Sequence, residues 1–130
     1  MGAFDMLRIA SSSLGMHQTW LDALAHNISN ANTVVRTDET AFQEQMLVVE
    51  ARENAGVAVT GIELGDAGGT LQYAPEHPLA DENGMVRGPA MDMTTQMTSL
   101  IQAQRGFQAS VQTTKTAQDT YAAALQIGRP

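Results

Sequence analysis

The 130-residue chain contains no cysteine and few aromatic or basic residues. Without cysteine it forms no disulfide framework, no thiolate nucleophile and no thiolate zinc site. Seven Lys and Arg stand against fourteen Asp and Glu, which gives a net charge of -7. Nucleic-acid backbones and anionic membrane surfaces are bound by clustered basic residues. The acidic balance therefore argues against both, and we expect no nucleic-acid partner.

Long apolar runs are missing as well. No stretch reaches the roughly 18 consecutive apolar residues that a membrane-spanning helix needs, so we expect no direct membrane insertion. The first residues, MGAFDMLR, lack the basic leader and continuous apolar run of a cleaved secretory signal. If the protein leaves the cytoplasm, we expect an export system that recognises a different signal.

Residues recurring every seven positions predict one long helix from about Phe4 to Asn30. The two rows, three positions apart, are Leu7, Leu14, Leu21 and Ile28, and Ala10, His17, Leu24 and Ala31. The resulting apolar stripe is too narrow for a helix that is buried on all sides. It needs one or two partner helices.

A second long helix is predicted from about Met91 to Ile127. Its two rows are Met93, Leu100, Phe107, Thr114 and Tyr121, and Met97, Gln104, Val111, Gln118 and Leu125. Gly106 lies in the middle, where glycine costs about 1 kcal/mol relative to alanine, and this indicates a close helix approach or a bend. Gly128 followed by Pro130 predicts the end of the helix.

The segment between the helices has β-type runs and three of the four prolines. Strands are predicted at Met46–Glu50, Val57–Leu64 and Thr70–Tyr73, and Asn83-Gly84 indicates a turn before Met85-Val86. The predicted fold class is α+β, divided as residues 1–31, 32–90 and 91–130. About 55 residues form only a marginal core, so the terminal helices must meet each other or pair with other chains.

No group of residues predicts an enzyme, a metal site or a cofactor. His17 and His26 are nine positions apart on one helix, so their side chains do not converge on a metal. No serine stands in a nucleophile-elbow context. Asp81–Gly84 is interpreted as a solvated turn, and Gly65–Gly69 lacks the pattern of a phosphate-binding loop.

Three segments resemble bacterial flagellar rod and hook proteins. Asn27–Thr33 resembles the N-(L/I)-(A/S)-N-x-x-T signature at the end of their N-terminal helix. Tyr73–Val86 resembles a Y-x-P-x-(H/N)-P-x-A-D-x-x-G-Y-V stretch of the proximal-rod subunits, with Met85 in place of Tyr. Arg105–Ser110 resembles their R-x-(Y/F)-x-A-N stretch, with Ser110 in place of Asn. The motif residues are Asn27, Asn30, Asn32, Thr33, Tyr73, Pro75, Pro78, Asp81, Gly84 and Arg105.

This resemblance implies a structural subunit of the flagellar basal-body rod, the periplasmic drive shaft that carries motor torque. Such subunits polymerise helically with themselves and with other rod proteins. Their terminal helices form an inner coiled-coil layer and the β region faces outward. They leave through the flagellar type III export apparatus without a cleaved signal, and Phe42 with Met46 fits an F-x-x-x-apolar export motif.

On this interpretation the apolar rows are the residues that pack subunits together. These are Leu7, Leu14, Leu21, Leu24, Ile28, Met97, Leu100, Phe107, Val111, Tyr121 and Leu125. Asn27, Asn30 and Asn32 either cap the first helix or hydrogen-bond to neighbouring subunits. The alternative function is a self-contained α/β binding or adaptor module whose terminal helices form a stable hairpin.

Overall fold

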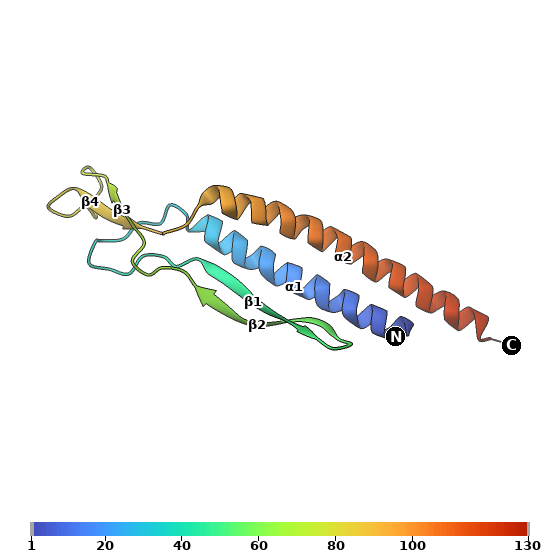
Figure 1. Ribbon diagram of the computed structural model, residues 1–130. Coiled ribbons are helices and arrows are strands. Elements are labelled where there is room, and N and C mark those ends of the chain that lie inside the picture. The colour runs from blue at the N-terminus through green and yellow to red at the C-terminus, as the bar shows by residue number, and fades with distance from the viewer. Residues whose placement is uncertain (1, 130) are drawn as a thin grey trace. The chain divides into compact units, whose positions relative to one another are not determined.

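The computed structural model describes residues 2–129, apart from the side chain of Ala3 (Figure 1). Its elements are α1 (Ala3–Ser29), β1 (Gln45–Arg52), β2 (Gly56–Leu64), β3 (Thr70–Tyr73), β4 (Met85–Gly88) and α2 (Met93–Ile127). Long terminal helices enclose a small β-rich middle in the sequence, so the α+β prediction is confirmed. Neither helix, over the residues described, is long and apolar enough to cross a membrane.

Residues at both ends of α2 define where this helix begins and ends. The Asp92 carboxylate caps α2 by accepting hydrogen bonds from the Thr94 and Thr95 backbone N–H groups. It also accepts the Thr95 hydroxyl at 2.6 Å. Helix α2 ends at Ile127, directly before Gly128, as predicted. Pro130, the other residue of that stop signal, lies outside the described residues.

The strands form two two-stranded sheets, β1–β2 and β3–β4. Strands β3 and β4 are antiparallel, with Tyr73 opposite Met85 and Thr70 opposite Gly88. The three predicted strands and the turn are confirmed: Gly84, just before β4, has a φ of +75°, which favours glycine. The Asp81 carboxylate accepts the Asn83 and Met85 backbone N–H groups, each at 2.9 Å, and so holds the loop.

The chain folds as two compact units. Unit 1 contains Met1–Leu21, Val48–Gly61 and Ile101–Pro130, and unit 2 contains Asp22–Leu47 and Ile62–Leu100. Each unit thus takes part of both helices and part of the β region. The division into residues 1–31, 32–90 and 91–130 stays a prediction about the layers of an assembly.

In unit 1, α1 contacts both the β1–β2 hairpin and α2 (Figure 1). The Ser12 hydroxyl accepts the Val57 backbone N–H at 3.1 Å, and the neighbouring Ser13 hydroxyl lies 2.9 Å from the hydroxyl of Ser110. The two terminal helices therefore contact each other within one molecule. The buried α2 residues are small and recur every seven positions: Ala103, Ser110 and Ala117.

In unit 2, Val86 of β4 is almost completely buried, and Leu24 and Ala41 are buried too. The Arg87 guanidinium ties two loops to β4, because it donates to the carbonyl oxygens of Thr37 and Gly68. Across residues 2–129, five of the seven buried apolar residues are alanines. Large apolar side chains are mostly exposed or half-buried, so the protein leaves much apolar surface uncovered.

Candidate assembly surfaces

Asn27, the first residue of the signature motif, is buried in unit 2 and joins three segments. Its side-chain Oδ1 accepts the Gln45 backbone N–H at 2.8 Å, and its Nδ2 donates to the Gln45 carbonyl at 3.0 Å. The same Nδ2 donates to Gln96 Oε1 at 3.1 Å, and Gln96 Nε2 donates to the Glu44 carboxylate. Asn27 therefore connects α1 to the start of β1 and to α2 inside one chain.

The other polar residues of this motif lie at the helix end. Asn30 Nδ2 donates to the His26 carbonyl at 2.9 Å, which satisfies one of the carbonyls left free at the end of α1. Asn30 Oδ1 accepts the Thr33 hydroxyl. Asn32 is exposed. Asn30 is thus a helix cap, whereas Asn27 is a tertiary connector, and only Asn32 presents its side chain to solvent.

The two helices approach closely in unit 1 at Gly106. A Cβ at this position would collide with the His17 imidazole, so the close approach predicted for Gly106 is confirmed. Next to this contact, Met6, Ile9, Ala10, Ser13, Ser110, Thr113 and Ala117 line a mostly apolar groove of about 400 Å³.

The residues predicted to pack subunits together divide into two sets. Leu24 is buried within the chain, and six others are half-buried: Leu7, Leu14, Leu21, Ile28, Leu100 and Phe107. The remaining four, all on α2, are exposed: Met97, Val111, Tyr121 and Leu125. Ile101, between Met97 and Val111, is exposed as well. Within unit 1, Ile101 and Val111 lie on the side of α2 away from the buried Ala103, Ser110 and Ala117, and this exposed row is available to another subunit. The half-buried set already contributes to the fold.

The β1–β2 hairpin also carries exposed apolar residues, which are Val49 and Val59 in unit 1 and Met46, Ile62 and Leu64 in unit 2. Exposed apolar residues that gather on one element mark an interaction site more often than scattered ones do.

A comparison with known proteins identifies the family. A family model described as the flagellar basal body rod FlgEFG protein C-terminal matches residues 82–127. The chain is 31% identical to the flagellar basal-body rod protein FlgC of Yersinia enterocolitica, over 99% of this chain and 100% of that protein. It is 32% identical to the protein of the same name from Aquifex aeolicus, over 85% of this chain and 86% of that protein. The chain belongs to the FlgC family of flagellar basal-body rod proteins.

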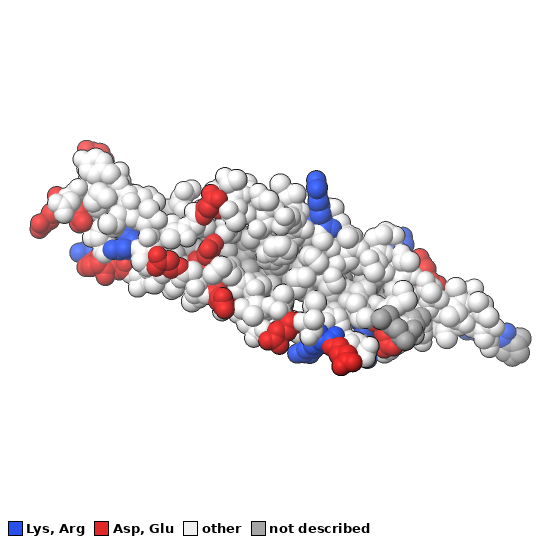
Figure 2. All heavy atoms as spheres, in the orientation of Figure 1, with Lys and Arg blue, Asp and Glu red and all other residues white. Residues whose placement is uncertain are grey.

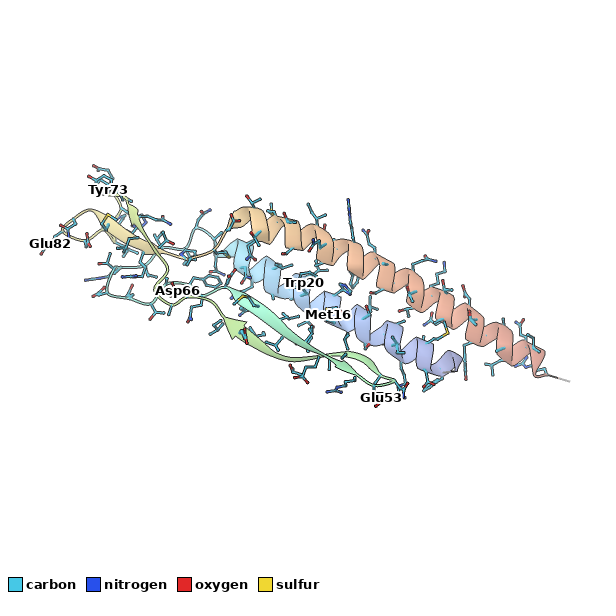
Figure 3. The ribbon with its side chains drawn as sticks, in the orientation of Figure 1. Met16, Trp20, Glu53, Asp66, Tyr73 and Glu82 are labelled. Carbon is cyan, nitrogen blue, oxygen red and sulfur yellow. The ribbon has the colours of Figure 1, made fainter. Side chains whose placement is uncertain are left out.

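The FlgC-like segment Tyr73–Val86 is both a fold element and an exposed surface. Asp81 and Gly84 shape its loop from within. Tyr73 is 74% exposed, and Pro75 and Pro78 are exposed as well. Figure 3 shows Tyr73 and Glu82 pointing outward from the β3–β4 part of unit 2. Arg105, in the third FlgC-like segment, is exposed on α2.

The residues of the predicted export motif sit at the start of the β region. Phe42 is half-buried, and its ring centroid lies 5.3 Å from that of His26. Met46 is exposed on β1. The folded chain therefore covers part of this motif.

Among the described residues no group of three or more His, Cys, Asp or Glu could hold a metal ion. Backbone donation from Met85 lowers the pKa of Asp81 below its ordinary value, and the Thr95 hydroxyl does the same for Asp92. Both carboxylates act as acceptors in the fold.

The sequence did not identify several residues that organise the protein. Gln45 and Gln96 bind Asn27, and Ser12 binds the hairpin. The row Gln96, Ala103, Ser110 and Ala117 has the same seven-residue spacing as the predicted rows, one position before Met97. Small and polar residues at heptad spacing were the signal that could have found this row.

Proposed function

We propose that the chain is a structural subunit that polymerises helically, with itself and other rod proteins, into the periplasm-spanning flagellar rod. The rod passes motor torque to the hook and filament. Membership of the FlgC family supports the rod assignment. The exposed apolar row of α2 is the observation that supports polymerisation. A chain that stayed a monomer would leave these side chains in water.

Burial of these side chains supplies the driving force for assembly. Each large apolar side chain that is removed from water contributes roughly 1.5–3 kcal/mol, and losses of side-chain freedom offset part of this. A heterologous contact whose rotation does not close produces a helical filament. In this assembly the terminal segments 1–31 and 91–130 form the inner coiled-coil layer, and residues 32–90 face outward.

We further propose export through the flagellar type III apparatus without a cleaved signal. The Phe42–Met46 motif would be read before folding, since Phe42 packs against His26 in the folded chain. Phe42→Ser together with Met46→Ser should then lower the amount of subunit exported. The export-deficient chain should accumulate in the cytoplasm, and export at the normal level would contradict this step.

The polymerisation step is tested with a charge placed in the exposed row. Val111→Asp should abolish incorporation into the rod and motility in cells that depend on this chain, while the purified subunit keeps its helix content and unfolding midpoint. Gln102→Asp is the matched control, because it adds the same charge to an exposed position on the opposite side of α2. Leu21→Asp and Phe107→Asp should also abolish assembly, but both residues are half-buried and these changes also disturb the fold. Normal motility with Val111→Asp would contradict the proposal.

The pairing of α1 with α2 inside one chain is the observation that favours the adaptor alternative. Amide hydrogen exchange on the purified monomer separates the two functions. Fast exchange along both helices would mean that they order only on assembly. Strong protection along both, together with intact motility of Val111→Asp cells, would favour the self-contained module.

A further inference from the structure

Unit 1 presents an apolar and charged surface at each of two elements, α2 and the hairpin tip. On α2, the exposed Ile101 and Val111 are accompanied by the exposed Arg105 and Lys115. At the hairpin, the exposed Val49 and Val59 are accompanied by Glu50 and Glu53, both exposed. Both surfaces thus combine large apolar side chains with charge, and the signs are opposite.

The remaining charges extend this complementarity. Asp119 is exposed one helical turn beyond Lys115, and Arg52 is exposed between the two hairpin glutamates. The α2 surface therefore carries two cations and one anion, and the hairpin carries two anions and one cation. None of these six charges takes part in an ion pair within the described chain, where the pairs are Arg8–Asp5 and Arg36–Asp38.

The two surfaces are also separate within unit 1 and of similar length. The hairpin contacts α1 through Ser12, and α2 contacts α1 through Ser13, so α1 lies between them (Figure 1). Figure 3 shows Glu53 at the hairpin tip, directed away from α1, and Figure 2 shows acidic and basic side chains together there. From Ile101 to Val111 a helix rises about 15 Å, and from Val48 to Arg52 a strand spans about 13 Å.

We propose that the exposed face of α2 binds the β1–β2 hairpin of a second copy of this chain. The contact buries Val111 and Ile101 against Val49 and Val59 of the other copy. Arg105 and Lys115 pair with Glu53 in the turn and, around the edge of β1, with Glu50, whose side chain leaves the strand on the face opposite to that of Val49. In each contact one copy uses its α2 face and the other copy uses its hairpin. The contact is therefore heterologous and extends into a filament. This partner assignment rests on the proposed rod function and names the surfaces through which it operates.

Charge exchange between two variants tests the contact. Variant A carries Arg105→Glu and Lys115→Glu, and variant B carries Glu50→Lys and Glu53→Lys. In each variant alone both surfaces have the same sign, so self-association, measured by sedimentation velocity at low salt, should weaken by roughly tenfold or more. In an equimolar mixture every A–B contact has opposite signs, so association should return to near the wild-type level. A mixture that associates no better than A or B alone would overturn the proposal.

Cysteine cross-linking gives a second, independent measurement, since the chain has no native cysteine. Val59→Cys and Val111→Cys chains, mixed and oxidised, should form mainly the 59–111 disulfide. The matched control is Val59→Cys with Gln102→Cys, which places the thiol on the opposite exposed side of α2 from Val111. A dominant 111–111 product, or no product above the control, would overturn the proposed contact.

The result is distinguishable from a failure of the rod function. If Val111→Asp blocks motility while the charge exchange and the cross-link both fail, the chain remains a rod subunit and the hairpin is not its partner. If Val111→Asp leaves motility intact, the rod function itself fails.

Discussion

The imidazole of His17 lies against Gly106 of the facing helix, at a site where any side-chain Cβ would collide with the ring. The ring atom Nδ1 is 2.8 Å from the Ser13 carbonyl oxygen, and a carbonyl only accepts, so Nδ1 donates. This hydrogen bond holds the ring in one orientation. The facing residue must therefore be glycine, although glycine costs about 1 kcal/mol in a helix relative to alanine.

We predict that Gly106→Ala destabilises the protein. The gain in helix propensity of about 1 kcal/mol is opposed by a cost of about 1–3 kcal/mol for crowding the ring. The free energy of unfolding should fall by up to about 2 kcal/mol, as measured by urea unfolding followed by circular dichroism.

Two controls separate crowding from propensity. Gly15→Ala, in α1, places its Cβ where nothing lies within 4 Å, so it should stabilise the protein by up to about 1 kcal/mol. In a His17→Ala background, Gly106→Ala should become stabilising as well. The same loss of stability with and without the His17 ring would contradict the assignment.

Asn27→Ala should be strongly destabilising. It leaves the Gln45 backbone N–H and carbonyl and the Gln96 amide without their side-chain partner in a buried site. An unpaired buried group costs about 1–3 kcal/mol, so the expected loss is about 2–4 kcal/mol by urea unfolding. Asn32→Ala, at an exposed residue of the same motif, should change stability by less than about 0.5 kcal/mol. Equal effects at the two positions would show that the buried connection contributes nothing.

The sequence predicted the helices and strands because periodicity is a local property of the chain. It did not identify which row of α2 packs within the molecule. The rows that contain Met97 and Gln96 are adjacent on the helix, and the larger apolar side chains of the first favoured it. In the structure the small side chains of Ala103, Ser110 and Ala117 face inward, because they allow a close approach of the helices.

The role of Asn27 could not be found from local pattern for a different reason. Its partners Gln45 and Gln96 are 18 and 69 positions away in the chain, and no spacing rule connects residues so far apart. The motif identified Asn27 as important, but only the fold shows that its partners are inside the same chain.

Stability should fall in acid, in part through Asp81. Donation from the Met85 backbone, with smaller contributions from Asn83 and Thr37, lowers the pKa of its carboxyl below the ordinary 3.8. A carboxyl whose pKa is lower in the folded state stabilises the fold above pH 3.8, and that contribution is lost as the pH falls through the folded pKa. Urea midpoints at neutral pH and near pH 3 should therefore differ less for Asp81→Asn than for the wild type. Glu82→Gln removes the same charge from an exposed neighbour and should keep the wild-type difference, whereas an unchanged difference in Asp81→Asn would contradict the role of Asp81.

The C-terminal end of α2 should be the least protected part of that helix in the monomer. Ser13 faces Ser110 and His17 faces Gly106, so the helices run antiparallel in unit 1. With this register, positions beyond about 120 would face residues that precede the start of α1 at Ala3. All residues from Gln118 to Ile127 are exposed, and two turns of helix without a packing partner are only marginally stable in water. Amide exchange should be fast over 120–127 and slow over 103–117, and assembly should slow it over 120–127. Uniform protection to Ile127 in the monomer would mean that this end is stabilised without a neighbouring subunit.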